Sequence, residues 1–449
     1  NIDLRINGKL SNDLKIQAVI SDNNLPFQED GSSYKLQEFD KVFIRIYNEK
    51  TEIITGDIFT KNKSRFLNYQ RKSKGIVVNN NRDFNNYNYK SSTSLSMSKG
   101  KYSTNNFMGT EGNQGPYKLK GINGESYIVV LSGTEKIFMD GNLLKRGEEN
   151  DYIINYNSSE IIFTNKNIIT KDKRFYVEFE YNDRSYAQST IFSNQEIKTE
   201  KVLFNFNFYS ESDWKNQNYL TDLSDNDKKI LSESGDNKTQ ILSNSIDSVS
   251  YNNEIILYKK MDTTISGIPI IYYKFSNNQD SAYYQIKFTQ VDQNNGDYIL
   301  KEEGMNGRIF SWIAPISIGG DLVSQGNFTP NIRIVSPKSK NIISAELKYN
   351  ISKRINTTAN FTFQNLDENL FSDLDDSDNN SISTFFEFDY LIFQNKKIQI
   401  SSKNSVEYIS RGYEGVIRYK EVEFDRNWNI SDIIGNQTLL NHQLFLLSN

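Results

Sequence analysis

Cysteine is absent from the chain, and its absence excludes several classes of site. Without a thiol the protein has no disulfide framework, no thiolate metal site and no cysteine nucleophile. Histidine is almost as scarce, since His442 is the only one in the sequence. A single imidazole cannot build a histidine metal cluster, and the surrounding stretch LLNHQLF contains no acid and serine for a hydrolytic triad. We therefore interpret His442 as an ordinary strand position and expect a protein that is not an enzyme.

Long apolar segments are also missing. The longest ones, YIVVL at residues 127–131 and IPIIYY at 268–273, are far shorter than the roughly 18 residues that a membrane helix needs. If the chain enters a membrane, it therefore does so with strands. The sequence begins with Asn1 rather than methionine and shows no basic segment followed by an apolar one, so we expect any targeting signal to lie outside it.

An excess of positive charge is missing as well. The chain has 52 Lys and Arg against 56 Asp and Glu, spread along its length, with a formal net charge of −4. Such a chain offers no basic face for DNA or RNA, so we exclude nucleic acid as a partner. Aromatic side chains are abundant at 13% of all residues, and we expect rings rather than leucine and alanine to fill the apolar surfaces.

Apolar and polar residues alternate with a period of two from one end of the chain to the other. In one example the apolar positions are Ala345, Leu347, Tyr349 and Ile351, and a second series follows at 355–363 after a short turn. Such alternation predicts antiparallel hairpins with one apolar face and one polar face. The apolar face could lie against a protein core or against lipid, and the polar face against bulk water or a water-filled lumen.

The predicted strands are joined by connections of two kinds. Short turns are expected at residues 11–13, 48–51, 352–354 and 394–397, and long polar links at 21–38, 60–75 and 365–380. Outer-membrane barrels have this asymmetry, with tight turns on the periplasmic side and long loops on the outer side. A soluble sandwich has less reason to alternate short and long connections.

Two stretches depart from the simple alternation. Residues 110–182 predict a small inserted β domain, with a hairpin turn at Asp140-Gly141 where glycine tolerates a positive φ. Residues 211–330 contain the one convincing helix, near 224–234, and the rest of that stretch predicts an extracellular insertion with short strands. The remaining chain is expected to supply barrel strands at 1–109, a barrel strand at 183–210 and barrel hairpins at 331–449.

Several segments of the sequence resemble segments found in the members of one family. They are LQEFDKVFI at 36–44, SKGKYSTNNF at 98–107, WIAPISIGGDLVSQGNFTP at 312–330, YKEVEFDRNWNI at 419–430 and the segment 111–184. Together they resemble the large, mostly uncharacterised outer-membrane β-barrel surface proteins of Bacteroidota. The piece with GTEKIFMDGNLLKRG is similar to a β module in the gliding-motility and type IX secretion protein SprA. The resemblance implies an outer-membrane location and the N-terminal part of a longer barrel, and it brings no catalytic residues.

One acidic loop, LDENLFSDLDDSDNN, has part of the order of a calcium site. Asp376, Asp378, Asn380 and Glu387 match positions 1, 3, 5 and 12 of a calcium-binding loop. Ser381 stands where glycine should make the sharp turn, and the alternation that follows would aim Glu387 away from the others. We expect a solvated outer loop, with Asp376, Asp378 and Asn380 as a candidate site for surface calcium or for divalent ions that bridge to lipopolysaccharide.

These patterns predict an all-β fold, an antiparallel transmembrane β-barrel with inserted small β-rich extracellular domains and one short helix. We expect a non-enzymatic protein of the cell outer membrane, acting in transport, in secretion or assembly, or in surface interaction. Its expected partners are lipid, lipopolysaccharide and other outer-membrane or surface proteins, with no cofactor apart from the candidate calcium. The alternative is a secreted soluble β-sandwich that binds polysaccharide or acts in adhesion, and a third possibility is a surface hydrolase that uses a carboxylate pair.

Overall fold

The computed structural model of the protein divides into two compact units. Unit 1 comprises Asn1–Asp222 and Pro337–Asn449, and unit 2 is the inserted segment Leu223–Ser336. The structure describes residues 2–22, 40–98, 100–122, 124–125, 128–182, 186–218, 223–236, 241–253, 255–304, 307–319, 321–395, 397–430 and 435–448.

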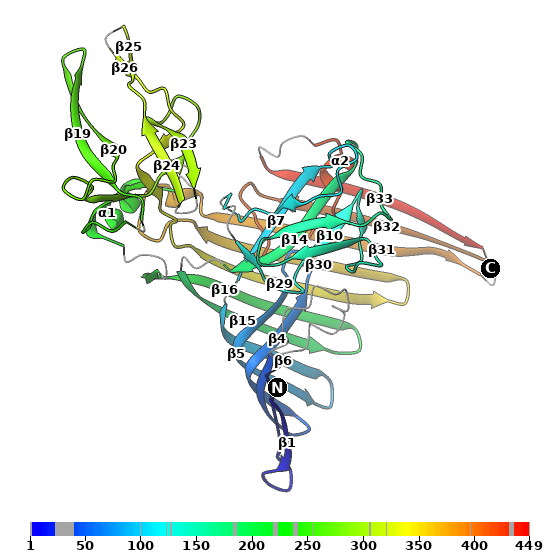
Figure 1. The fold of residues 1–449 in the computed structure, drawn as a ribbon. Helices are drawn as coiled ribbons and strands as arrows, with labels where there is room; N and C mark the ends of the chain where they lie inside the picture. Colours follow the sequence, from blue (N-terminus) through cyan, green and yellow to red (C-terminus); the bar gives the residue numbers. More distant parts are fainter. Residues whose placement is uncertain are drawn as a thin grey trace. The chain divides into compact units, whose positions relative to one another are not determined.

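Unit 1 is built on one large antiparallel sheet of thirteen strands, which lie next to one another in chain order (Figure 1). The antiparallel all-β prediction is therefore confirmed. Within the described residues β1 and β33 each pair with one neighbour, so closure of the sheet into a barrel stays a prediction. The strands are β1 Ile2–Lys9, β2 Lys15–Asp22, β3 Asp40–Tyr47, β4 Thr51–Lys63, β5 Asn68–Asp83, β6 Asn88–Ser98, β15 Tyr186–Lys198, β16 Val202–Asn218, β29 Ser339–Ser352, β30 Ile355–Asp367, β31 Asn380–Gln394, β32 Ile398–Ile409 and β33 Gln437–Ser448.

The connections differ between the two ends of this sheet. At one end every connection is short: the predicted turns lie at residues 10–14, 48–50, 353–354 and 395–397, and two further turns that were not predicted lie at 84–87 and 199–201. At the other end the chain leaves the sheet for both insertions and for the links 368–379 and 410–436. The long link predicted at 60–75 is wrong, because β4 and β5 continue through it and only 64–67 form the turn; polar side chains on one face made these strands resemble a loop. Most of the link predicted at 21–38 lies outside the described residues.

The first insertion forms a small β module that starts earlier than predicted. β7 was expected in the large sheet, but it pairs with β14 along its whole length and belongs to the module. The Asp140-Gly141 turn is confirmed, since it joins β10 to β11 with positive φ at both residues. The module core contains a ring stack in which Phe163 and Phe175 lie 4.3 Å apart. Its strands are β7 Lys101–Met108, β8 Tyr117–Lys118, β9 Val129–Val130, β10 Lys136–Met139, β11 Asn142–Leu143, β12 Tyr152–Asn155, β13 Glu160–Phe163 and β14 Arg174–Asn182.

Unit 2 consists of short strands around an aromatic core. Phe288 and Phe310 stack at 4.4 Å, next to the buried Tyr298 and Phe328. The predicted bounds 211–330 need correction at both ends, because β16 of the large sheet runs to Asn218 and unit 2 extends to Ser336. Its strands are β17 Leu242–Asn244, β18 Ile246–Ser248, β19 Tyr258–Ile265, β20 Ile268–Phe275, β21 Tyr284–Ile286, β22 Thr289–Gln290, β23 Tyr298–Gly304, β24 Gly307–Trp312, β25 Ile316–Ile318, β26 Asp321–Val323, β27 Phe328–Thr329 and β28 Asn331–Arg333.

Helices are short throughout the described part of the chain. The predicted helix is α1 Asp225–Glu233 in unit 2, and α2 Phe424–Asn427 and the 3-10 turn η2 Asp376–Asp378 belong to unit 1. No helix among the described residues is long and apolar enough to cross a membrane.

The start of α1 is fixed by a capping box. The Ser224 hydroxyl accepts a hydrogen bond from the Asp227 backbone N–H at 3.2 Å, and the Asp227 carboxylate accepts one from the Ser224 backbone N–H at 3.0 Å. We expect Ser224→Ala to lower the free energy of unfolding of unit 2 by about 1 kcal/mol, because an N-terminal donor loses its acceptor. Urea unfolding followed by far-UV circular dichroism measures the loss, with the exposed Ser232→Ala as a control. No loss at position 224 would contradict the role of the cap.

Candidate functional site

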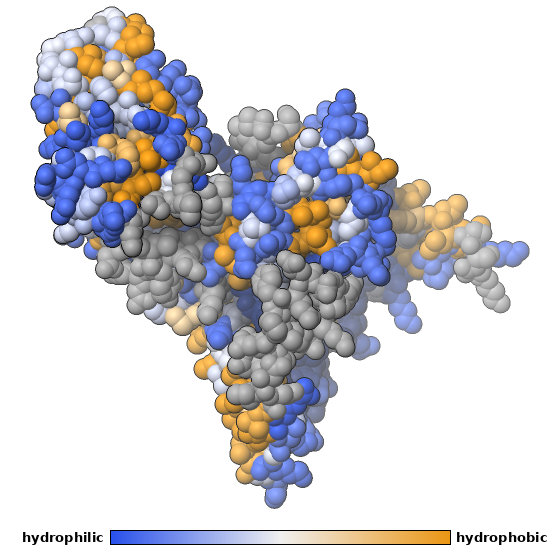
Figure 2. Space-filling view, viewed as in Figure 1, coloured by the Kyte–Doolittle hydropathy of each residue, from blue (hydrophilic) through white to orange (hydrophobic). Residues whose placement is uncertain are grey.

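One face of the large sheet carries exposed apolar side chains on every strand. Pairing registers place them all on the same face, and they are 37% to 71% exposed. Figure 2 shows part of this surface on the N-terminal strands. We call it the apolar belt; it comprises Leu4, Ile6, Ile20, Val42, Ile44, Ile53, Ile76, Leu95, Ile191, Phe206, Ile343, Leu347, Phe361, Phe386, Val406, Leu440 and Leu444.

The belt crosses the strands obliquely. The row of paired residues through Leu95 and Ile191 continues to Ser210 and Asn341, and so leaves the belt as it crosses the sheet. If the belt runs parallel to the plane of a membrane, the strands must therefore be tilted relative to the membrane normal. Closed barrels require this combination of strand tilt and stagger. On β31 the exposed apolar residues run from Ile382 to Phe393. At about 3.3 Å per residue and a tilt of about 40°, this run spans roughly 28 Å, close to the height of about 25 Å of the apolar band on outer-membrane barrels.

The opposite face, here called the inner face, combines polar side chains with a buried aromatic and aliphatic cluster, and it curves inward. The Arg71 guanidinium on β5 donates a hydrogen bond to the Glu211 carboxylate on β16 at 2.9 Å, although β6 and β15 lie between these strands. Three strand spacings cover about 14 Å in a flat sheet, so this contact requires curvature toward the inner face. Tyr69 on β5 also stacks on Phe192 of β15 at 5.0 Å. Polar side chains near the insertions are buried here, including Ser94, Thr190, Asn207, Ser344, Thr362 and Ser383.

Part of the inner face is covered by residues 410–430, here called the strap, which follow β32. The Tyr413 hydroxyl donates to the carbonyl of Phe66 in the turn between β4 and β5 at 3.1 Å. The Gln364 amide on β30 donates to the carbonyl of Gly412 at 3.2 Å. The strap also contacts the module, where Arg418 pairs with Glu178. The sequence predicted hairpins throughout 331–449 and did not predict the strap. The segment 419–430 was the only indication of it in the sequence.

A cavity of about 680 Å³ lies between the inner face at β4 and β5, the module and the strap. Its charged lining includes Arg71 from the sheet and Lys136, Glu178 and Glu180 from the module. Glu180 is only 9% exposed. Burial is the main factor that raises its pKa above the usual value; nearby Glu211 adds to the effect, while the positive charges of Arg71 and Lys136 oppose it.

The raised pKa of Glu180 predicts how stability depends on pH. Because the folded protein holds this proton more tightly than the unfolded chain, stability falls as the pH rises from the unfolded value of about 4.3 through the folded pKa. Glu180→Gln removes this loss, so the variant is expected to become more stable than the parent protein between about pH 4 and pH 7. Urea titrations at both ends of this range measure the difference. The exposed Glu148→Gln should show no such gain, and an equal gain there would contradict the assignment.

The predicted calcium residues do not converge on one point. Asp376 and Asp378 lie in the turn η2, where the Asp376 carboxylate accepts a hydrogen bond from the Asn379 amide at 3.1 Å. Asn380 begins β31, and its side-chain oxygen accepts from Asn365 on β30 at 3.1 Å. Glu387 lies further along β31 and pairs with Lys403 at 3.0 Å. Among the described residues no cluster of three or more His, Asp or Glu side chains could hold a metal, and the calcium site stays a prediction.

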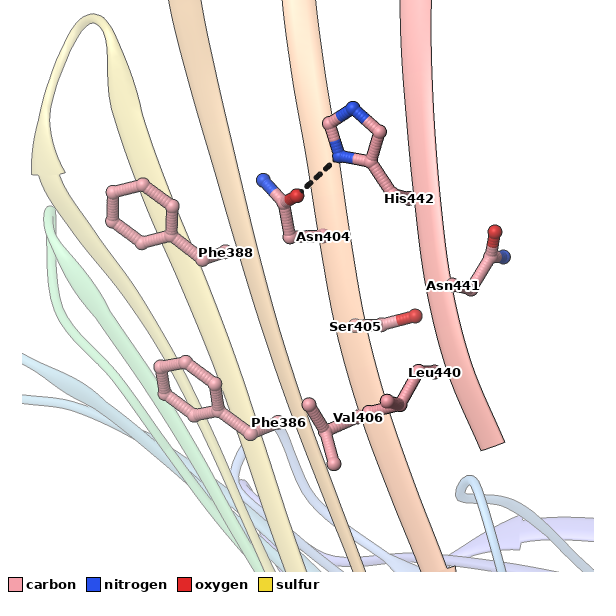
Figure 3. Close-up of a pocket in the computed structure, with 8 residues that line it drawn as sticks. All are labelled: Phe386, Phe388, Asn404, Ser405, Val406, Leu440, Asn441 and His442. Atoms are coloured by element: carbon pink, nitrogen blue, oxygen red, sulfur yellow. Dashed lines mark hydrogen bonds between the residues drawn. The ribbon is translucent and has the colours of Figure 1, made fainter. Parts of the chain in front are cut away.

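His442 lies on β33 within the apolar belt, between Leu440 and Leu444. Its Nδ1 atom lies 2.5 Å from the side-chain oxygen of Asn404 on the neighbouring strand β32 (Figure 3). The two residues line a groove of about 360 Å³ on this face, together with Phe386. The strand position predicted for His442 is therefore confirmed, with a hydrogen bond that the sequence did not indicate.

Comparisons with known proteins cover the module and the whole chain. Residues 102–183 match a sequence family described as a domain of unknown function, DUF8818. No curated protein matches the chain. Among solved structures the chain is similar to OmpT, an outer membrane protein of Vibrio cholerae in its trimer form, at 6% identity and a TM-score of 0.24, over 99% of this chain and 90% of that one.

Two further solved structures are similar at the same level. They are OccK8 (OprE) of Pseudomonas aeruginosa, at 9% identity and a TM-score of 0.18 over 99% of this chain and 91% of that one, and OccAB4 of Acinetobacter baumannii, at 7% identity and a TM-score of 0.17 over 99% and 88%. Scores this low add no weight to any function. The chain is thus a mostly β protein of two units, in which residues 102–183 match DUF8818.

Proposed function

We propose that this protein is a non-enzymatic outer-membrane β-barrel protein that presents folded modules at the cell surface. The observation that carries the proposal is the apolar belt, which is exposed on all thirteen strands of the large sheet. Lipid chains would remove these side chains from water, at roughly 25 cal/mol for each Å² of apolar surface. In a closed barrel every backbone N–H and C=O would also be paired within the bilayer.

The connections give the proposed orientation. Short turns join the strands at one end of the sheet, and both insertions leave from the other. In outer-membrane barrels the short turns lie on the periplasmic side, so the module and unit 2 would lie outside the cell. There they would meet lipopolysaccharide and other surface proteins, in transport, in secretion or assembly, or in surface interaction. The strap and the module would restrict the polar lumen, which favours a gated or closed barrel over an open pore.

A secreted β-sandwich is the second candidate. In a sandwich two sheets pack their apolar faces together about 10 Å apart. Belt residues such as Leu347 and Phe386, at 42% and 52% exposed, do not have this packing in the described structure. The belt therefore favours lipid over a second protein layer.

Location and orientation can be tested together with engineered thiols, because the chain has no cysteine of its own. Asn142→Cys places an exposed thiol on β11 of the module, and Asn12→Cys places one in the turn between β1 and β2. We expect a membrane-impermeant maleimide to label the first variant on intact cells and the second only after the outer membrane is permeabilised. Labelling of both variants on intact cells, or recovery of the protein in the aqueous phase without detergent, would contradict the proposal.

A further inference from the structure

The cavity between the inner face and the module has two buried charged side chains in its wall, Arg71 and Glu180. The side chain of Arg71 is 4% exposed and pairs with Glu211 at 2.9 Å. Glu180, which is 9% exposed, lines the same cavity as Arg71 and places a second carboxylate near this guanidinium. The charged lining as a whole is balanced, with Arg71, Lys72 and Lys136 against Asp57, Glu178 and Glu180, but a buried carboxylate without an ion pair of its own is costly.

The positive charges of Arg71 and Lys136 act on Glu180, but no described residue pairs with it directly. The Glu180 carboxylate accepts no hydrogen bond and forms no ion pair among the residues that the structure describes. Lys136 from the neighbouring strand lies 4.0 Å from Glu178, which Arg418 of the strap also contacts. Glu180 thus remains an unpaired acceptor on the cavity wall.

The cavity also offers apolar surface and sufficient room. Phe43, Ile54, Ile58 and Ile417 line it alongside the charged groups. Its volume of about 680 Å³ lies in the range of small-molecule sites, which are mostly apolar with a few placed polar groups. A flexible alkyl chain that ends in a charged nitrogen combines both features, because methylene groups cover apolar surface while the nitrogen donates to a carboxylate.

We propose that this cavity binds an aliphatic amine, either a free polyamine or the lysine side chain of a peptide, with the Glu180 carboxylate as the acceptor of its ammonium group. The ammonium group would supply the ion-pair partner that Glu180 lacks, without breaking the Arg71–Glu211 pair. It lies on the inner face, so the inference does not depend on whether lipid covers the apolar belt.

Isothermal titration of the purified full chain tests the site with four probes. The amines are 1,5-diaminopentane and the lysine tripeptide acetyl-Gly-Lys-Gly-amide; their counterparts without an amine are 1,5-pentanediol and acetyl-Gly-norleucine-Gly-amide. We expect at least one amine to bind and its counterpart without the amine not to bind. The amine with the higher affinity shows whether the natural ligand is a polyamine or a peptide. Glu180→Gln should weaken amine binding by at least about tenfold, since a charge-assisted hydrogen bond is lost. The exposed Glu148→Gln on the same module should leave it unchanged.

Equal binding of amine and neutral probes, no binding of either amine, or full binding to Glu180→Gln would overturn the proposal. If that variant does not fold, the parent protein decides the question through carbodiimide coupling of 1,5-diaminopentane and peptide mass mapping. Amide formation at Glu180, at a concentration of the diamine that leaves Glu148 unmodified, supports the site. Coupling confined to exposed carboxylates such as Glu148 overturns it.

Discussion

Leu347→Arg is expected to destabilise the protein in lipid vesicles by about 2–4 kcal/mol, the cost of an arginine near the midplane on the lipid face of an outer-membrane barrel. Leu347 lies in the middle of the apolar belt, between Phe204 on one neighbouring strand and Ala359 on the other. An arginine there would either bring its charge into hydrocarbon or pull lipid headgroups and water inward. Urea unfolding in vesicles, followed by tryptophan fluorescence, measures the change.

A matched substitution separates lipid contact from a general effect of added charge. Asn350 is on the same strand three residues away, but its side chain is exposed on the inner face, beside Asn356. Asn350→Arg should change the free energy of unfolding by less than about 0.5 kcal/mol, as surface substitutions usually do. If Leu347→Arg is equally harmless, the belt faces water and the membrane assignment fails.

The same strand pair shows how much of the fold follows from sequence. The alternation from Ala345 to Phe363 predicted a hairpin with two unlike faces, and β29 and β30 pair in that register around a turn at 353–354. Local rules suffice here, because a period of two fixes the face of each side chain and a short turn fixes the register. The Asp140-Gly141 hairpin of the module was predictable for the same reason.

Sequence reasoning failed where distant segments determine the structure. β5 resembles a loop because Arg71 and Ser73 occupy positions that an ordinary core would fill with apolar residues. They are buried by the curvature of the sheet and by the overlying module, and no local sequence pattern indicates the curvature or the position of the module. The strap is another case, since its contacts with Phe66 and Gln364 span about 350 and 50 residues of sequence. The cavity and Glu180 depend on the same long-range packing, and so they were not predictable.

Arg71→Met is expected to cost about 3–5 kcal/mol in the free energy of unfolding, because it leaves the Glu211 carboxylate, only 18% exposed, without its charged partner. Arg71 reaches Glu211 across two intervening strands, and the Tyr209 hydroxyl donates to the same carboxylate. The pair therefore joins parts of the sheet that its curvature brings together. Denaturant unfolding of the variant in vesicles measures the loss. As a matched control, the more exposed pair of Lys90 and Glu196, at 3.8 Å, should lose at most about 1 kcal/mol in Lys90→Met.

The double variant Arg71→Met with Glu211→Gln identifies the cause of the loss. If the cost comes from the unpaired charge of Glu211, neutralising Glu211 should restore most of the stability, since replacing both partners of a buried pair is often nearly neutral. If instead the pair is needed to hold the curvature of the sheet, the double variant should be as unstable as Arg71→Met alone. A cost below about 1 kcal/mol for Arg71→Met would contradict both explanations, because it would mean that water already solvates Glu211 and that the inner face is open at this point.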